Sequence, residues 1–374
     1  MRRLLVISTL VLLVAPAGAE AAGFKVRGGG YGDGVGMSQY GAQGFAQQGR
    51  GYRAILRHYY QDTRLDEMGG RRVRVLLQAS HPELASFSNA VRVGRKTVDP
   101  GRTHTVRAAR SGKLVVRAEG AGRIGRFESP LKVRGEGAIV QLGGTALNEV
   151  TGGRYRGRME FRPGLSGGVT AINDVGIDDY VRGVIAAEMP ASWHQEALKA
   201  QAVAARSYAI ATDKGSAIFD HYPDTRSQVY RGVQAEEPST DHATAATARE
   251  VVTYNGSVAT TYFFSASGGH TENVENVFGG SRVPYLRGVS DPHDDISPLH
   301  RWSYRYSRRE LEAKLGSLVQ GRLRRVRVVE RGVSRRIVTA RIVGSEGSTT
   351  ASGSTLRSGL GTPGTPRSIR RVRR

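Results

Sequence analysis

The order of apolar and polar residues divides the chain into regions of different structure. Between residues 72 and 173, short apolar runs alternate with polar residues and are broken by glycines. β-Branched residues with a period of two, separated by glycine, are typical of strands joined by hairpins. The runs are VRVLLQA, AVRVG, THTVRAA, KLVVRAE, LKVRG, AIVQLGG and GGVTAIND. This region therefore predicts a β-rich module.

Helical periodicity appears on both sides of this module. Residues 24–65 begin with glycines, and the stretch YRAILRHYYQ then repeats apolar residues at the spacing of one helical stripe. Helical spacing returns at Ile177, strands are predicted again in 250–290, and a helix with two strands is predicted in 303–345. The mixture of separate helical and strand regions indicates an α+β fold.

We divide the chain into six parts at these changes of pattern. They are a signal peptide (1–21), a glycine-rich helical segment (22–68), the β-rich module (69–164), a mixed helix and sheet core (165–300), a basic α/β C-terminal segment (301–355) and a basic tail (356–374). The tail is rich in Pro, Gly and Arg and offers little to bury, so we expect it to be disordered.

The N-terminus has the pattern of an export signal. Arg2 and Arg3 precede an apolar run of 12 residues at positions 4–15, and the small residues of AGAEA follow. A basic start, an apolar centre and an A-x-A site are typical of a secretory signal peptide. The alternative is a membrane anchor, which needs about 20 apolar residues. The sequence therefore predicts a secreted protein, and the absence of cysteine suits export into a bacterial cell wall.

Composition limits the chemistry and the partners. The chain has no cysteine, which excludes disulfides, a thiolate nucleophile and thiolate zinc ligands. The net charge is +22, and residues 301–374 hold 19 Lys and Arg against 4 Asp and Glu. Basic surfaces attract polyanions, and those available to an exported protein are wall polymers and lipid headgroups, so we expect the tail to bind anionic wall polymers. Nucleic acid is the alternative partner, but no nucleic-acid-binding signature occurs. The positive charge could also reflect a proteome that is rich in arginine throughout, without any specific partner.

One glutamate ends an apolar helical stripe. Val181, Val184 and Ile185 lead to Glu188 at helical spacing, and Pro190 prevents the helix from continuing. Asp178 or Asp179 is expected to cap this helix. Ser192 and Gln195 form the pattern of a capping box for a second, alanine-rich helix from Trp193 to about Ala211.

A carboxyl group at the end of an apolar stripe is partly desolvated. Desolvation raises the pKa of a carboxyl group, and a general acid in glycoside cleavage requires a raised pKa. The alternative is an ordinary glutamate paired with Lys199 or Arg206. A serine hydrolase is not supported, because no G-x-S-x-G motif occurs.

Several motifs together resemble the stage II sporulation protein D family, which includes LytB-type modifiers of wall amidases. The stretches that carry the resemblance are DDYVRGVIAAEMPASWHQEALKAQAVAARSYA, FDHYPDTRSQVYRGVQ, YFFSASGGHTENVENVFGG and PYLRGVSDP, between about 165 and 295. GVGMSQYGAQGFAQQGRGYRAILRHYYQDTRL looks like a companion segment that often ends the chain in these proteins. The resemblance implies binding of peptidoglycan glycan strands.

In catalytic members, the resemblance implies a lytic transglycosylase that cuts the MurNAc–GlcNAc bond and leaves a 1,6-anhydro end. The catalytic glutamate of the family falls on Glu188, and one carboxyl group suffices because the C6 hydroxyl of the sugar is the nucleophile. The alternative is a non-catalytic activator of a separate wall amidase. Residues that match family positions along the groove are Lys199, Arg206, Gln228, Tyr230, Ser265, Ser267, Gly268, Gly269 and Thr271.

Three departures from the family pattern are visible. Tyr222, Arg226 and Ser227 stand where some members have a Cys–His–Cys cluster for zinc, so we expect no metal and no cofactor. The remaining ligand types are expected to be solvated loop residues, namely His221, Asp224, His270, His293, Asp294 and Asp295. Relatives usually read GHGVGMSQ, and here Asp33 replaces the histidine. The chain also ends in TPGTPRSIRRVRR, where an apolar finish is expected.

The glycines of GGGYGDGVGMSQYGAQGFAQQG do not form a nucleotide-binding loop, because the stretch lacks lysine and the G-x-G-x-x-G register fails. We expect a tight turn in which backbone approaches backbone, followed by a helix near residues 37–48. Ser38, Gln39 and Tyr40 then either face a glycan or pack within the fold.

Overall fold

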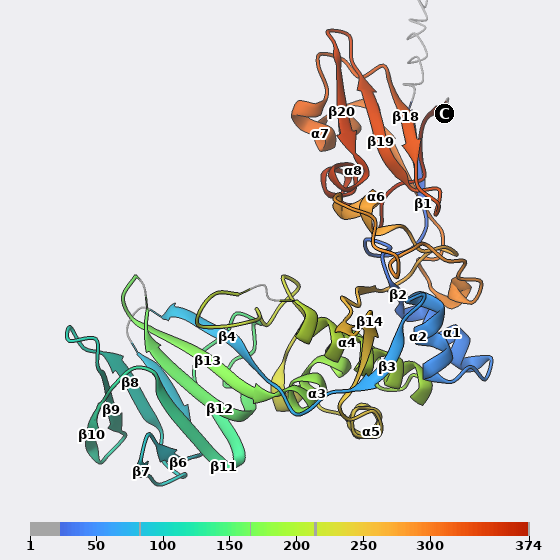
Figure 1. Cartoon of the computed structure of the whole chain (residues 1–374). Helices are drawn as coiled ribbons and strands as arrows, with labels where there is room; N and C mark the ends of the chain where they lie inside the picture. The colour runs from blue at the N-terminus through green and yellow to red at the C-terminus, as the bar shows by residue number, and fades with distance from the viewer. Residues whose placement is uncertain (1–22, 82–83, 165, 213–214, 373–374) are drawn as a thin grey trace, which may run out of the picture.

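The computed structural model describes residues 23–81, 84–164, 166–212 and 215–372. The expected signal peptide (1–21) lies outside the described residues. Figure 1 shows a β-rich module on one side, a central body of helices, and a C-terminal part that rises from that body. Helices and sheets occupy largely separate parts of the chain, so the α+β prediction is confirmed. Within the described ranges, no helix is long and apolar enough to cross a bilayer.

The β-rich module contains one ten-stranded sheet. Its main path runs β10-β9-β8-β5-β11-β12-β13-β4, and β6 pairs with β11 and β7. The strands are β4 (Arg72–His81), β5 (Ala85–Ser88), β6 (Ala90–Val93), β7 (Lys96–Thr97), β8 (His104–Ala108), β9 (Leu114–Ala118), β10 (Gly122–Phe127), β11 (Leu131–Leu142), β12 (Arg154–Pro163) and β13 (Val169–Gly176). The sheet continues past residue 164, because β13 pairs with β12 and β4.

The central body is built around two helices that follow this sheet. They are α3 (Ile177–Glu188) and α4 (Gln195–Ala211). Val181, Val184 and Ile185 of α3 lie in the same buried cluster as the apolar residues of the sheet. The module and the helices therefore share one core and are not independent units.

Both helices begin differently from the sequence prediction. Gly176 caps α3 without a side-chain hydrogen bond, and Asp178 pairs with Arg206 instead. At α4, Nδ1 of His194 accepts a hydrogen bond from the Glu196 amide at 3.2 Å, so the expected capping box does not form. The short chain from Pro190 to His194 turns before the helix starts, which moves Ser192 out of the cap position.

The glycine-rich segment and the later strands cover α4. The elements are β2 (Met37–Ser38), α1 (Gln39–Gln47), α2 (Tyr52–Tyr59), β3 (Arg64–Glu67), α5 (Pro238–Ala246), β14 (Glu250–Tyr254), β15 (Ser257–Val258), β16 (Phe263–Phe264) and α6 (Val274–Phe278). β2 pairs in parallel with β16, and β3 pairs with β14. Ala197, Ala200 and Ala204 of α4 are fully buried, and these small side chains let the covering elements pack closely.

The C-terminal part holds two three-stranded sheets, ordered β17-β1-β21 and β18-β19-β20. Its elements are β1 (Gly23–Gly28), β17 (Trp302–Ser307), α7 (Arg308–Leu315), β18 (Arg325–Arg331), β19 (Ile337–Val343), β20 (Ser348–Ser352), α8 (Gly353–Leu360) and β21 (Ser368–Val372). β1 therefore lies between two strands from the far end of the chain.

The prediction of a disordered tail from residue 356 is wrong. α8 and β21 occupy most of this stretch, and β21 pairs with β1 from Ser368 to Val372. Leu356, Leu360 and Ile369 are buried with Phe24 and other apolar residues of the C-terminal part. Three well-spaced apolar residues and one free sheet edge are enough to order a segment whose composition is basic.

Candidate functional site

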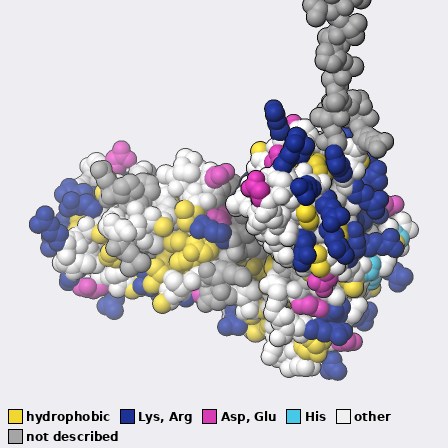
Figure 2. Space-filling model, turned by 90° about the horizontal axis from the view of Figure 1, so that it is seen from above, with side chains coloured by type: hydrophobic (Ala, Val, Ile, Leu, Met, Phe, Trp, Pro, Cys, Tyr) yellow, Lys and Arg dark blue, Asp and Glu magenta, His cyan; other side chains and the backbone are white. Residues whose placement is uncertain are grey.

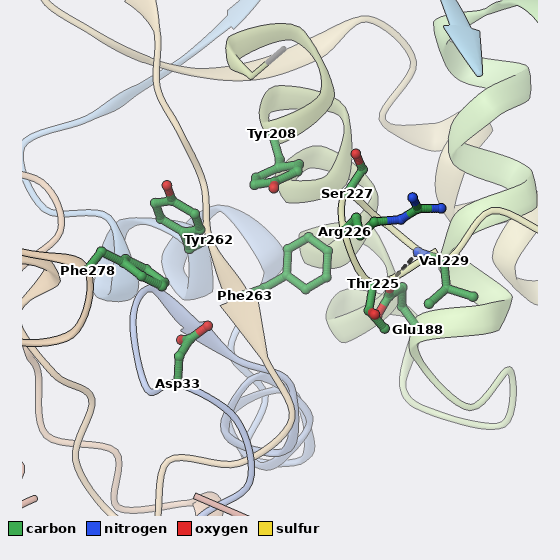
Figure 3. Close-up of a pocket in the computed structure, with 10 residues that line it drawn as sticks. All are labelled: Asp33, Glu188, Tyr208, Thr225, Arg226, Ser227, Val229, Tyr262, Phe263 and Phe278. Carbon is green, nitrogen blue, oxygen red and sulfur yellow. Dashed lines mark hydrogen bonds between the residues drawn. The ribbon is translucent and has the colours of Figure 1, made fainter. Parts of the chain in front are cut away.

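Glu188 lies in a cleft between the end of α3 and loops from distant parts of the chain (Figure 3). The cleft has a volume of about 490 Å³. Its lining combines two carboxyl groups with aromatic rings and a basic loop. The lining residues are Asp33, Glu188, Tyr208, Thr225, Arg226, Ser227, Val229, Tyr262, Phe263 and Phe278.

Glu188 is held at the last residue of α3. Its Oε1 accepts a hydrogen bond from the Val229 amide at 3.0 Å, which ties the carboxyl group to the loop that follows His221. Burial raises the pKa of Glu188, and the Val229 amide and the Gln39 side chain partly offset this increase. The prediction of a desolvated carboxyl group is consistent with this environment.

Neither basic residue expected near Glu188 pairs with it. Lys199 binds Glu196 at 2.7 Å, and Arg206 binds Asp178 at 2.7 Å. Arg206 is fully buried, and its Nη1 also donates to the Glu250 carbonyl at 3.0 Å. Lys199 forms its ion pair within α4, Arg206 joins α4 to α3 and β14, and neither residue lines the cleft. A role for these residues in holding the glycan stays a prediction. The alternative of an ion-paired Glu188 fails, because both basic residues pair with other carboxylates.

Gln228 and Tyr230 support the loop that carries Val229 and do not line the cleft. Tyr180 donates a hydrogen bond to Oε1 of Gln228 at 3.2 Å, and Tyr230 donates to Oδ1 of Asn173 at 2.7 Å. Both side chains are buried. They were predicted along the groove, and the structure corrects this to a role behind it, where they fix the position of the Val229 amide.

The predicted residues of the SASGG stretch and Thr271 also lie outside the cleft lining. The amides of Ser267 and Gly268 donate to the Asp294 carboxylate at 2.7 and 2.8 Å. Ser265 accepts from the Tyr40 amide, Gly269 donates to Ser267, and Thr271 accepts from Val289. Arginines of the C-terminal part donate to the carbonyls of Ser267 and Gly268. The group is a scaffold that surrounds a buried aspartate.

The expectation that the scattered ligand-type residues are solvated is wrong for two of them. Asp294 and His221 are fully buried. Asp294 accepts hydrogen bonds from Ser38 at 2.9 Å and lies 2.9 Å from Nδ1 of His300, in addition to the two amides. Nε2 of His221 lies 2.8 Å from the Ala209 carbonyl. In the described part of the chain, no three His, Asp or Glu side chains are grouped so as to hold a metal ion.

The glycine-rich segment reaches the cleft region through the start of α1. Gln39 is the first residue of α1 and its side chain acts on the pKa of Glu188, while Ser38 is buried as the helix cap and accepts from the Gly41 amide at 3.1 Å. Tyr40 packs edge-on against Trp193 at 4.9 Å. Of the three residues expected to face a glycan, only Gln39 thus acts on the Glu188 carboxyl group, and none lines the cleft.

Asp33 is a cleft residue that the sequence did not identify. Its Oδ1 accepts a hydrogen bond from the Val35 amide at 2.8 Å, and Figure 3 shows its carboxyl group in the same cleft as Glu188. Burial raises the pKa of Asp33, which the Val35 amide and Arg357 partly offset. The sequence did contain one indication of this role. Asp33 stands where the pattern GHGVGMSQ has a histidine, so the position holds a titratable residue in both cases.

Aromatic rings give the cleft an apolar wall. Tyr262 and Phe278 lie 5.0 Å apart with their planes at 37°, and Tyr208 meets Tyr262 at 5.8 Å. Phe278 is 52% exposed although it is a large apolar residue. An exposed ring beside polar groups suits a ligand with both apolar faces and hydroxyl groups, which is the character of a sugar.

Comparison with known proteins agrees with the motifs. The model of the Stage II sporulation protein family matches residues 165–254. An uncharacterized protein of Brachyspira hyodysenteriae is 40% identical over 171 residues, which is 45% of each chain. Stage II sporulation protein D of Bacillus subtilis is 32% identical over 168 residues, covering 40% of this chain and 49% of that protein.

A third relative, the amidase enhancer of Bacillus subtilis, is 42% identical over 135 residues, covering 36% of this chain and 18% of that protein. The chain thus matches about half the length, or less, of these curated relatives. The matched family region contains α3, α4 and Glu188, and the resemblance seen in the motifs is confirmed. Residues 165–254 of the chain are thus similar to the Stage II sporulation protein (SpoIID) family.

Proposed function

We propose that the protein is an exported peptidoglycan-remodelling enzyme, a lytic transglycosylase that cleaves the MurNAc–GlcNAc bond of glycan strands. The observation that supports this most is Glu188, a carboxyl group with a raised pKa in a cleft with an aromatic wall. The relatives named for sporulation and for amidase enhancement support a role at the cell wall. A protein with this function acts outside the cytoplasm.

The reaction requires one group that first gives and then takes a proton. Protonated Glu188 donates its proton to the glycosidic oxygen, and the bond from the anomeric carbon to that oxygen breaks. The C6 hydroxyl of the same sugar attacks the anomeric carbon and releases its proton to Glu188. The product carries a 1,6-anhydro ring, no water is consumed, and the enzyme returns to its starting state.

The contacts of Glu188 suit both halves of this cycle. Burial favours the protonated form before cleavage, because an isolated carboxylate is costly in a desolvated site. The Val229 amide at 3.0 Å then stabilises the carboxylate that forms when the proton leaves. A single residue therefore serves as acid and base without a second carboxyl group.

The second candidate is a non-catalytic activator of a separate wall amidase. The observation that favours it is the 42% identity to a protein named amidase enhancer. An activator would use the same cleft to bind glycan and would produce no cleavage of its own. A wall amidase would then be the partner.

Basic residues of the C-terminal part support binding to anionic wall polymers. Lys25 lies directly opposite Arg305 on one side and Arg370 on the other, across the sheet of β17, β1 and β21. None of these three side chains has an ion pair within the described ranges. Figure 2 shows Lys and Arg side chains gathered over this part of the molecule.

The first test is digestion of purified glycan strands without stem peptides, followed by mass spectrometry. Wild type should release fragments with 1,6-anhydro ends, and Glu188→Gln should release none while still binding the strands. Reducing ends in place of anhydro ends would mean hydrolysis, for which Asp33 is the available second carboxyl group. Glycan binding without fragments from either protein would favour the activator, and a mixture with a wall amidase would then be assayed.

A further inference from the structure

A second hollow lies in the β-rich module and takes no part in the proposed reaction. Its volume is about 720 Å³, and it lies between the β6–β7 hairpin, β10 and the start of β11. Figure 1 places these strands at the end of the module away from α3 and α4. Cationic side chains dominate the lining, among them Arg92, Lys96, Arg126, Lys132, Arg134 and Arg158.

Three of these arginines form a ladder across neighbouring strands. Arg134 of β11 lies directly opposite Arg92 of β6 on one side and Arg158 of β12 on the other. Like charges in directly opposed positions destabilise a sheet, and neighbouring strands are only about 4.8 Å apart. The arrangement therefore lowers stability unless something outside the sheet neutralises it.

The protein itself neutralises little of this charge. Arg158 pairs with Asp174 at 2.7 Å, but Asp174 also pairs with Arg72 at 2.6 Å. Among the described residues, neither Arg92 nor Arg134 has a carboxylate within ion-pair distance. Two arginines of the ladder are therefore available to an external anion.

The acidic residues near the hollow are already engaged. Glu128 lines it but pairs with Lys113 at 2.5 Å. Glu160 lies opposite Lys132 across β11 and β12, yet its carboxylate binds Arg162 at 2.6 Å. The hollow thus presents positive charge over an apolar floor, to which Leu131 contributes a buried side chain.

We propose that this arginine ladder binds a linear polyanion with repeated phosphodiester groups, the chemistry of an anionic wall polymer. The planar guanidinium group holds a phosphate by two parallel hydrogen bonds. A row of such groups across three strands suits a chain of anions better than a single ion. The apolar floor suits the carbon backbone between the phosphates. The site is separate from the cleft and from the cations of β1, β17 and β21.

The ladder makes a paired prediction on stability and binding. Replacement of Arg92 and Arg134 by glutamine removes the repulsion, so the free protein should unfold at a higher temperature. The same replacement removes two phosphate contacts, so binding should weaken by about tenfold or more. A ladder that serves only to hold the sheet together would give the opposite change in stability.

The experiment is calorimetric titration of the full exported chain with poly(glycerol phosphate) at low and high salt. The variant is Arg92→Gln with Arg134→Gln, and the control is Arg107→Gln with Arg117→Gln. The control pair lies on the exposed side of β8 and β9 outside the hollow and removes the same charge. Wild type and the control should bind alike and lose affinity with salt. The ladder variant should bind at least about tenfold more weakly and melt at a higher temperature.

Three results would overturn the proposal. They are equal loss of binding in both variants, a lower melting temperature in the ladder variant, and tighter binding of a single-stranded oligonucleotide than of the phosphodiester polymer through the same arginines. Glu188→Gln should bind the polymer like wild type. The cleavage reaction at Glu188 and polymer binding by the arginine ladder are therefore tested separately, and either can be refuted without the other.

Discussion

At the scale of single residues, the environment of Glu188 decides when it carries a proton. Burial is the largest influence and raises the pKa of the carboxyl group. The Val229 amide and the side chain of Gln39 act in the opposite direction. The Val229 amide belongs to the backbone, whereas the side chain of Gln39 can be replaced directly. A substitution at Gln39 therefore changes the pKa of Glu188 without altering Glu188 itself.

Replacement of Gln39 by leucine should raise the pKa of Glu188 further, because the side chain that favours the charged form is lost. Cleavage needs the protonated acid, so activity falls as pH rises through that pKa. Gln39→Leu should therefore move the high-pH limb of the kcat/KM profile to higher pH, as measured with peptide-free glycan strands.

Gln47→Leu is the matched control, since Gln47 lies on the exposed end of the same helix. Its profile should coincide with that of wild type. If Gln39→Leu lowers activity at every pH without moving the limb, Gln39 acts by placing α1 and not through the charge of Glu188.

Asp291 gives the same kind of argument for stability. It is fully buried, accepts a hydrogen bond from Tyr59 at 2.8 Å, and has no partner among the described residues for Oδ2. Burial, followed by the nearby charge of Asp294, raises the pKa of Asp291 to about 6. An ordinary aspartate has a pKa of 3.8, so the folded protein binds this proton more tightly than the unfolded chain.

The sign of the pH effect follows from that difference. The stabilisation is fully present below the unfolded pKa of 3.8, where both states are protonated, and it is lost as pH rises to the folded pKa of about 6, because only the folded state keeps the proton in that range. The loss is on the order of 3 kcal/mol, since one pKa unit corresponds to about 1.4 kcal/mol. Urea unfolding of wild type should show this fall between about pH 4 and the folded pKa of about 6. Asp291→Asn should flatten it, and an unchanged slope would refute the assignment.

At the scale of elements, the turn before α1 depends on close backbone contact. Gly36 has φ of 79° and directly precedes β2, which pairs with β16. A Cβ atom at Gly36 would lie 2.0 Å from the Tyr262 carbonyl oxygen. Tyr262 lines the cleft, so a side chain at position 36 would disturb both the turn and the aromatic wall.

Gly49→Ala offers a matched comparison for Gly36→Ala. Gly49 has φ of 78°, and a Cβ atom at this position would meet no described atom within 4 Å. Gly49→Ala should therefore cost only the backbone strain of about 1 kcal/mol. Gly36→Ala should lose at least about 2 kcal/mol more in denaturant unfolding, because the contact cannot relax without moving backbone. Equal losses would show that the contact is unimportant.

Sequence patterns predicted the elements better than their contacts. The alternation in 72–173 predicted the strands, and the apolar stripe ending at Glu188 predicted the last residue of α3. Neither the alternation nor the apolar stripe predicted the order of strands in the sheet. β5 and β6 both pair with β11, and periodicity does not encode which strands pair or in which register.

The site shows the same limit. The family motifs identified Glu188 but assigned Arg206 and Tyr230 to the groove, because a motif does not distinguish a residue that lines a cleft from one that supports it. Both are buried and bound to other parts of the fold by internal hydrogen bonds. Asp33 was missed because it reaches the cleft from a segment far from Glu188 in the chain.

At the scale of the whole molecule, the C-terminal part is fixed to the body by buried polar contacts. Nη2 of Arg336 donates to the Ser267 carbonyl at 2.9 Å, and Glu272 accepts from the amides of Val333 and Ser334 at 3.1 and 3.2 Å. The C-terminal part also contacts the glycine-rich segment, since Trp302 donates from its ring nitrogen to the Gly30 carbonyl at 3.0 Å. The glycine-rich segment is therefore held between the body and the C-terminal part.

The pairing of β1 with β21 makes a rearranged chain possible. Gly23 lies directly opposite Val372, so a turn of about two to five residues can join them as an antiparallel hairpin. A new start at Gly70 and a new end at Gly69 would open an exposed stretch, where a Cβ atom at either glycine would meet nothing within 4 Å. The GVGMSQ segment would then stand near the end of the chain, as in the proteins it resembles.

This rearranged protein should melt within about 5 °C of wild type and give the same cleavage products. Its control is the same joined chain opened within α4, between Ala202 and Val203, where both residues are fully buried. The control should fail to fold. If the version opened at Gly69 also fails, β1 and β21 are not joined in the way the structure describes.

The same pairing has a consequence for the order of events during synthesis. β1 begins at Gly23 and precedes both of its partners in the chain, the nearer of which begins only at Trp302. Its amide and carbonyl groups therefore stay unpaired until most of the chain has been made. The core shared by the ten-stranded sheet, α3 and α4 contains no residue of β1 or β21, so it can form before the sheet of β17, β1 and β21 is complete.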